Sequence, residues 1–337
     1  MKRKAMLYVI GFLFFTFFAL PGDISAAPYY EGKVLRIIVG YKPGGGYDRM
    51  ARLVAKYLPR YIPGKPTVII ENMEGADSII AANYLYNIAK PDGLTIGTFN
   101  RTLLFAPMMT LEGSKFDIAK YRWIGSTAVE GTVLTVRQDL PYRTITDLLK
   151  TKTPLVLGST GPMDPGSQFP NLLKEFAGLN ATLITYPSSA DVMLAVERRE
   201  VDGRAGAYSS LKPFIDRGLV RPLVRGQVAE KGMENLPVNT DFTTDKKGKA
   251  IMGVFSIADL IGRPYVAPPK TPVEIMNILM KAFTAMGDSP ELQAEAEKVG
   301  MGIKYTSGKE VLKAITSTLN QPPEIISEFS KYMKYQK

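Results

Sequence analysis

The chain has 337 residues and a formal net charge of +10, and it contains no cysteine and no histidine. These absences exclude disulfides, thiol nucleophiles, Ser-His-Asp triads and metal sites built on thiolates or imidazoles. We therefore expect a binding protein and not an enzyme, with no metal and no cofactor. Lysine and arginine are dispersed along the chain, which is typical of a solvated surface, so we expect no nucleic-acid partner.

The chain begins with the pattern of a secretory signal. Three basic residues at positions 2–4 precede an uncharged apolar stretch, residues 5–20, and small residues follow at 25–27. The apolar stretch is shorter than the about 20 residues that span a membrane. We predict a signal peptide over residues 1–26, cleaved near Ala26 or one residue later, and a periplasmic mature protein. An uncleaved membrane anchor is the alternative.

The stretch after the signal indicates a strand, a glycine turn and a helix. An apolar run, residues 34–39, leads into a turn with Pro43, Gly44, Gly45 and Gly46, and apolar residues then recur at helical spacing. Glycine lets a backbone approach a ligand closely, and the start of a helix offers unpaired N–H groups to an anion. The unit therefore predicts an anion-binding turn.

Alternating strands and helices follow this unit. We predict strands at 67–70 and 94–99 with a helix at 79–89 between them, an order that favours a parallel sheet. Residues 121–136 are interpreted as one long strand that leaves the first domain. The ends of such strands are where ligands bind in parallel sheets.

A second set of alternating elements indicates a second lobe. Its predicted strands are 155–158, 182–186, 203–207 and 220–225. Its predicted helices are 147–150, 172–177, 192–199 and one that begins at Leu211 or Pro213. Three further helices are predicted at 272–286, 290–299 and 309–320.

The layout predicts an α/β protein of two lobes, each a sheet flanked by helices. Removing the signal leaves 337 − 26 = 311 residues, enough for two domains. We assign residues 27–126 plus 240–337 to lobe 1 and residues 127–239 to lobe 2, joined by crossings near 126–129 and 226–239. Small-molecule pockets favour such domain interfaces.

Several short motifs recur in an order that resembles one protein family over most of residues 33–330. The motif residues are Pro43, Gly44, Gly45, Asp48, Ala51, Arg52, Glu71, Asn72, Gly75, Ala76, Pro91, Asp92, Gly93, Gly158, Ser159, Gly161, Gly166, Ser167, Tyr186, Ala195, Val201 and Asp202. In this order the chain resembles the solute receptors of tripartite tricarboxylate transporters, the TctC or Bug family.

The resemblance implies a Venus-flytrap fold like that of type II periplasmic binding proteins, with two crossover hinges. It also implies a small carboxylate ligand, gripped by backbone N–H groups of Gly44–Gly46 on one lobe and by Ser159, Thr160 and Ser167 on the other. The expected partner is a membrane permease of one large and one small subunit, and the receptor itself is expected to be a monomer. A sensor of the same fold and an exported enzyme are the alternatives.

The candidate ligand-binding residues lie in the glycine and serine turns or at the ends of predicted strands. They are Tyr41, Pro43, Gly44, Gly45, Gly46, Asp48, Asn100, Ser159, Thr160, Ser167, Gln168, Tyr208 and Ser209. Asp48 has a competing role as the helix N-cap, because Asp is favoured at that position. Arg204, early in its strand, is interpreted as structural.

Two acidic positions depart from the family pattern. Glu74 stands where members often have proline, and Asp77-Ser78 replaces a usual Gly-Gly pair. If these carboxylates face the cleft, they disfavour a highly charged anion.

Overall fold

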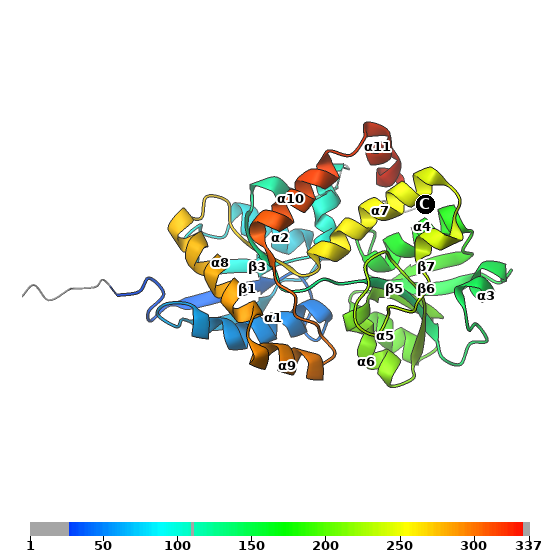
Figure 1. Cartoon of the computed structure of the whole chain (residues 1–337), viewed down its shortest axis with the longest axis horizontal. Helices are drawn as coiled ribbons and strands as arrows, with labels where there is room; N and C mark the ends of the chain where they lie inside the picture. Colours follow the sequence, from blue (N-terminus) through cyan, green and yellow to red (C-terminus); the bar gives the residue numbers. More distant parts are fainter. Residues whose placement is uncertain (1–26, 109–110, 333–337) are drawn as a thin grey trace, which may run out of the picture.

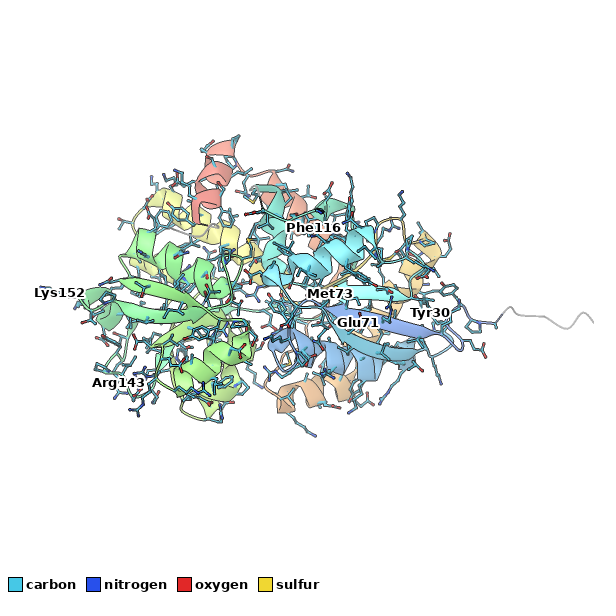
Figure 2. All side chains as sticks on the ribbon, turned by 180° about the vertical axis from the view of Figure 1, so that it is seen from behind. Tyr30, Glu71, Met73, Phe116, Arg143 and Lys152 are labelled. Carbon is cyan, nitrogen blue, oxygen red and sulfur yellow. The ribbon has the colours of Figure 1, made fainter. Side chains whose placement is uncertain are left out.

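The computed structural model describes residues 27–108 and 111–332, so the predicted signal peptide lies outside the described residues. Two sheets with their helices lie end to end along the long axis of the molecule (Figure 1). Seen from behind, Tyr30 lies at one end of that axis, and Arg143 and Lys152 lie at the other (Figure 2). The predicted two-lobed α/β fold is confirmed. We call the part around the first sheet the first lobe and the part around the second sheet the second lobe.

The first sheet has six strands and mixed directions. Its strands are β1 (Val34–Val39), β2 (Thr67–Asn72), β3 (Thr95–Thr98), β4 (Arg122–Ser126), β10 (Pro264–Ala267) and β11 (Thr306–Ser307). They pair in the order β11-β4-β10-β3-β1-β2. β1 is parallel to β2 and β3, as the sequence predicted, whereas β10 and β11 pair antiparallel with β4.

Helices cover both faces of the first sheet. Those flanking it are α1 (Gly46–Tyr57), α2 (Ile79–Asn87), α8 (Val273–Gly287), α9 (Pro290–Lys298) and α10 (Gly308–Leu319). The side chains of β1 alternate between the two faces, as the pleat requires. Leu35, Ile37 and Val39 pack with the cluster that contains α1 and α8, and Ile38 packs with the cluster that contains α2 and α10.

The second sheet has five strands, in the order β7-β6-β8-β5-β9. They are β5 (Thr132–Arg137), β6 (Leu155–Ser159), β7 (Ala181–Thr185), β8 (Gly203–Ala207) and β9 (Val220–Arg225). The helices around it are α3 (Ile145–Lys150), α4 (Pro165–Ala177), α5 (Ser189–Glu197), α6 (Tyr208–Asp216), α7 (Lys246–Ile261) and α11 (Pro323–Tyr332). Among the described residues, none of the helices in either lobe has both the length and the apolar character that a bilayer crossing requires.

The long strand expected at 121–136 is wrong, because the chain changes sheets inside it. β4 ends at Ser126 in the first sheet and β5 begins at Thr132 in the second. The connecting segment runs beside residues 259–263: Thr127 N–H donates to Arg263 O at 3.2 Å, and Glu130 N–H donates to Asp259 O at 2.9 Å. The two lobes are therefore joined by two segments that are hydrogen-bonded to each other.

Residues 226–239, where the sequence suggested a second crossing, lie beside β9. Arg225 N–H donates to Pro237 O at 3.0 Å, and α7 follows before the chain enters β10. α7 contacts α4 of the second lobe as well as α10 of the first. The predicted lobe boundaries at 126 and 239 stay predictions.

Several helices differ from the prediction. α7 and α11 were not expected, and α4 begins at Pro165 instead of residue 172. Asp164 caps α4 by accepting a hydrogen bond from Gly166 N–H, and proline suits the first turn because it has no N–H to satisfy. α6 likewise begins at Tyr208, before Leu211. These earlier starts place four predicted site residues in helical first turns instead of in loops.

Candidate functional site

Two of the cavities formed by the described residues lie where turns from the two sheets face each other. The smaller, which we call the inner cavity, has a volume of about 60 Å³ and is lined by the β1–α1 turn, residues 188–190 and three arginines. The larger, which we call the outer cavity, has a volume of about 690 Å³ and is lined by residues 74–79, 160–163 and 187–188. Tyr41, Lys42 and Ser188 line both cavities. The outer cavity lies in the range of about 300–1,000 Å³ that is usual for small-molecule sites.

The glycine turn places the start of α1 at the inner cavity. Gly45 is the N-cap, and no side chain caps the first turn. Gly46 lies so close to the second lobe that a Cβ built on it would be 2.2 Å from Ser210 Oγ and 2.6 Å from Arg263 Nη2. A larger residue there would displace these side chains, and the uncapped helix start is suited to an anion.

Asp48 stabilises the glycine turn through the hydrogen bonds of its side chain. Its side chain is buried and accepts hydrogen bonds from Gly44 N–H at 2.8 Å, Arg52 Nε at 2.8 Å and Asn72 Nδ2 at 3.0 Å. Burial alone would raise the pKa of Asp48, but these hydrogen bonds lower it below its usual value. Asp48 is not the N-cap and lines neither cavity.

Two tyrosines form one wall of the inner cavity. The rings of Tyr41 and Tyr47 are stacked with centroids 4.8 Å apart. Tyr47 Oη accepts a hydrogen bond from Arg101 N–H at 2.9 Å, and the Arg263 guanidinium lies 4.9 Å from the centre of the Tyr47 ring. Tyr47 therefore contacts two of the arginines that line the cavity.

Three buried arginines line the inner cavity, and each lies beside a carboxylate. Arg101 pairs with Asp259 at 2.8 Å, Arg263 pairs with Glu130, and Arg204 Nη2 lies 3.7 Å from an oxygen of Asp164. Arg101 Nε is buried and has no hydrogen-bond partner. A buried charged donor without a partner is costly, so the Arg101 side chain keeps hydrogen-bonding capacity that its protein partners do not use. Arg204, interpreted above as structural, lines the cavity.

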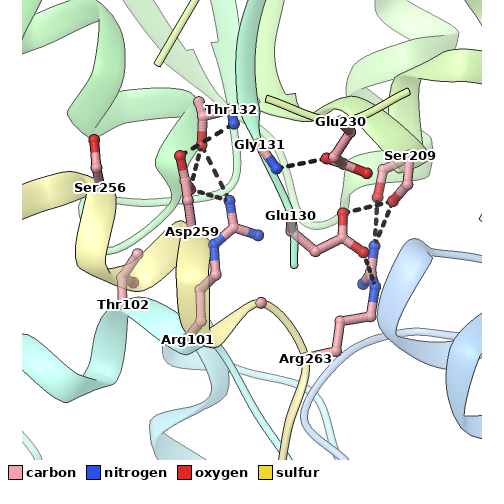
Figure 3. Close-up of polar contacts among 12 residues, drawn as sticks. Arg101, Thr102, Glu130, Gly131, Thr132, Ser209, Glu230, Ser256, Asp259 and Arg263 are labelled. Carbon is pink, nitrogen blue, oxygen red and sulfur yellow. Dashed lines mark hydrogen bonds and ion pairs between the residues drawn. The ribbon is translucent and has the colours of Figure 1, made fainter. Parts of the chain in front are cut away.

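A polar network joins Arg101 and Arg263 to the two segments that connect the lobes, residues 127–131 and 259–263 (Figure 3). Arg263 Nη2 donates to Ser209 Oγ at 3.0 Å, and Ser209 Oγ donates to Glu130 Oε2 at 2.6 Å. Glu230 accepts a hydrogen bond from Gly131 N–H. Burial, followed by the charge of Glu130, raises the pKa of Glu230 above its usual value.

The outer cavity carries acidic groups. Glu74, Asp77 and Glu112 line it, with Lys42 as its one basic residue among those described. Asp77 reaches the second lobe: its carboxylate accepts hydrogen bonds from Met163 N–H at 3.0 Å and Thr160 Oγ1 at 3.3 Å. Burial and the nearby charge of Asp164 raise the pKa of Asp77 to about 7. Both acidic departures from the family pattern therefore face the cleft.

The structure brings together about half of the predicted site residues. Tyr41, Pro43, Gly45, Gly46 and Asn100 line the inner cavity, and Tyr41 and Thr160 line the outer one. Those that line neither cavity are Gly44, Asp48, Ser159, Ser167, Gln168, Tyr208 and Ser209.

The residues outside the cavities have other contacts. Tyr208 Oη donates to Gly232 O at 3.1 Å, and Gln168 Nε2 lies 3.8 Å from Met163 Sδ. Ser159 Oγ is buried without a hydrogen-bond partner.

Asn100, which lines the inner cavity, also joins the lobes, because its Nδ2 donates to Met163 O at 2.9 Å.

Sequence reasoning missed Lys42, Tyr47, Asp164 and Arg263. The run Asp164-Pro165-Gly166 carried a usable signal, because Asp before Pro is a helix start. Arg263 had none, since its partner Glu130 is 133 residues away. No group of acidic residues suited to a metal ion occurs within residues 27–108 and 111–332.

Comparisons with known proteins agree with this geometry. A UPF0065 protein of Bordetella pertussis is 27% identical over 308 residues, which cover 90% of this chain and 91% of that protein. The structure of the periplasmic binding protein BugD superposes with a TM-score of 0.73 at 19% identity and covers 90% of this chain and 98% of its own. That of R. palustris Rpa4515 with adipate gives a TM-score of 0.73 at 19% identity, with coverages of 89% and 98%.

The family model described as tripartite tricarboxylate transporter family receptor, TctC, matches residues 50–330. That span includes most of both sheets and most of the residues that line the two cavities. The resemblance seen in the order of the motifs is thereby confirmed, and the expectation of a binding protein agrees with it. The chain belongs to the tripartite tricarboxylate transporter receptor family, whose members are solute-binding receptors and not enzymes.

Proposed function

We propose that this chain is a periplasmic receptor that closes its two lobes on a small organic carboxylate and delivers it to a membrane permease of one large and one small subunit. The signal peptide is removed near Ala26, and the receptor acts as a monomer. The observation that carries the proposal is the inner cavity, which is lined by the uncapped start of α1 together with Arg101, Arg204 and Arg263.

These groups suit a carboxylate in particular. Backbone N–H groups at a helix start and a buried guanidinium both donate to anionic oxygen, and such charge-assisted bonds are about twice as strong as neutral ones. The inner cavity, at about 60 Å³, has room for a carboxylate group but not for a whole organic acid. The remainder of the ligand extends into the outer cavity past Tyr41, Lys42 and Ser188, which line both.

Family membership and the relatives support this reading. Rpa4515, with which this chain shares its fold, was solved with adipate, a small carboxylate. The two hydrogen-bonded crossing segments provide the hinge for closure, and the closed form is the state that a permease would recognise.

Thermal unfolding of the chain from Ala27 onward, with a panel of carboxylates, tests the proposal. Any solute that co-purifies is first removed by unfolding and identified by mass spectrometry. A ligand that binds only the folded chain stabilises it by about 2.7 kcal/mol at a hundredfold excess over its Kd. A marked rise in Tm with one carboxylate, which stays chemically unchanged, supports a receptor. Absence of any shift across the panel, or turnover of the ligand, contradicts it.

A further inference from the structure

The loop before α2 is strained and places Asp77 across the cleft. Ala76, Asp77 and Ser78 have φ angles of 46°, 50° and 78° in succession, although none is glycine. Each non-glycine residue in the left-handed region costs on the order of 1–2 kcal/mol, so the conformation persists only where contacts over-determine it. One such contact is the hydrogen bond from Ser78 Oγ to Gly40 O at 2.9 Å. The others come from the second lobe.

The Asp77 carboxylate accepts hydrogen bonds from groups of the second lobe that face the cleft. It accepts from Met163 N–H at 3.0 Å and from Thr160 Oγ1 at 3.3 Å. Gly161 makes room for it, because a Cβ on this glycine would lie 2.2 Å from Asp77 Oδ2. The turn that would otherwise present these donors to a ligand carboxylate is thus filled by a carboxylate of the chain itself.

The two cavities differ in the charged side chains that line them. The outer cavity is lined by Glu74, Asp77 and Glu112, and its Lys42 Nζ already lies 3.7 Å from Glu74 and 3.8 Å from Asp191. A second ligand carboxylate would meet like charges there, at a cost of several kcal/mol. The inner cavity, in contrast, is lined by Lys42, three arginines and one aspartate, Asp164. The carboxylates that pair with Arg101 and Arg263, Asp259 and Glu130, line neither cavity.

We propose that Asp77 is the specificity-determining residue of the cleft, and that the ligand is a zwitterion with its carboxylate in the inner cavity and an ammonium group in the outer cavity beside Asp77. The inference rests on the proposed receptor function and narrows its ligand class. An ammonium group neutralises the acidic wall and donates to carboxylate oxygen by charge-assisted hydrogen bonds. A dicarboxylate of the same length is rejected by that wall.

Three matched ligand series test this inference by isothermal titration calorimetry. Each series contains a monocarboxylate, its ω-amino derivative and the dicarboxylate of equal length, at two, four and six carbons; the longest is hexanoate, ω-aminohexanoate and adipate. We expect the wild type to bind at least one amino acid about tenfold or more tightly than the matching dicarboxylate, a difference of about 1.4 kcal/mol.

The substitution Asp77→Asn removes the charge and keeps the backbone, because asparagine tolerates the left-handed region. We expect it to reduce that preference to near unity, while far-ultraviolet circular dichroism stays that of the wild type. Glu71→Gln is the matched control: Glu71 lies at the end of β2, pairs with Arg36 at 3.4 Å and lines neither cavity (Figure 2). It should leave the preference unchanged.

Three results overturn the inference. The first is a wild type that binds every dicarboxylate at least as tightly as its ω-amino counterpart. The second is a wild type that binds no member of the series, and the third is a folded Asp77→Asn variant with an unchanged preference. In each case the wider carboxylate panel tests the receptor function separately: a wild type that binds any acid in that panel remains a receptor.

Discussion

Arg101 and Asp259 form a buried ion pair between the lobes, with Nη2 2.8 Å from Oδ1 and side chains 2% and 0% exposed. Arg101 begins the turn after β3 of the first sheet, and Asp259 lies near the end of α7. Thr132, the first residue of β5, donates to Asp259 from both its hydroxyl, at 2.8 Å, and its N–H, at 3.2 Å. One carboxylate therefore ties together an inner-cavity arginine, the long connecting helix and the first strand of the second sheet (Figure 3).

Substitution of Asp259 by alanine should destabilise the fold severely. It leaves Arg101 buried without its counter-charge, and breaking a buried pair in this way costs about 3–5 kcal/mol. Urea unfolding followed by circular dichroism measures the change in the free energy of unfolding. The matched control is Asp216→Ala, which breaks the exposed Lys212–Asp216 pair and should cost less than about 1 kcal/mol. Equal losses for the two variants would contradict this account of the pair.

Gly46 should be the most sensitive position of the glycine turn. In Gly46→Ala, the new Cβ collides with Ser210 of α6 in the second lobe and with Arg263, which directly precedes β10. Because the clash with Ser210 is between the lobes, it should oppose their closure on a ligand, and we expect affinity to fall by about tenfold or more while the variant still folds. Calorimetry measures the affinity, and far-ultraviolet circular dichroism checks the fold.

Gly45→Ala is the control for this substitution. A Cβ on Gly45 has one neighbour within 4 Å, Lys42 O at 3.9 Å, and the φ of −73° suits alanine. Its effect on affinity should stay within about threefold, because no protein atom has to move. A loss in Gly45→Ala as large as that in Gly46→Ala would indicate that steric closure is not what the glycines provide.

Asp48 should support the turn without touching the ligand. Asp48→Ala removes the acceptor for Gly44 N–H, Arg52 and Asn72, and hydrogen bonds to charged groups are worth about 1.5–3 kcal/mol. We expect a loss of stability in that range together with weaker binding, as the turn loosens. The test is whether Asp48→Ala lowers the affinity for every ligand of the panel by the same factor. A change in ligand preference would mean that Asp48 contacts the ligand after all.

The parts of the fold that the sequence predicted are local in the chain. The β1–α1 unit was visible because an apolar run, a glycine turn and helical spacing follow one another within residues 34–57. β10 was not visible in the sequence. Its four residues pair antiparallel with β4, which lies far away in the chain, so no local pattern indicates this strand. α7 was missed although Asp245 caps it by accepting from Lys247 and Gly248 N–H, because its start reads as a polar, basic segment.

The site residues divide in the same way, into those that a local pattern predicted and those that depend on contacts between distant parts of the chain. Asn100 and Thr160 were found because they directly follow strands, where ligands gather in such sheets. The pairing of Arg263 with Glu130 and that of Asp77 with Met163 join residues 133 and 86 positions apart. Such contacts depend on how the lobes meet, which no local pattern records. Glu74 and Asp77 stood out only as departures from the motif order of the family.

The stability of the protein should depend on pH through Asp77. Its pKa rises from 3.8 to about 7 on folding, because burial and the charge of Asp164 disfavour its ionised form. Between these two values the folded chain holds a proton that the unfolded chain has released, so stability is greatest below the lower value and falls as pH rises, by up to about 1.4 kcal/mol per pH unit. Asp77→Asn, which does not titrate, removes this contribution. Urea unfolding of both proteins from pH 4 to pH 8 should therefore show a stability difference that shifts steadily in favour of the variant up to about pH 7 and then levels off. A difference that stays constant across the series would show that the Asp77 carboxylate titrates in the folded chain as it does in water.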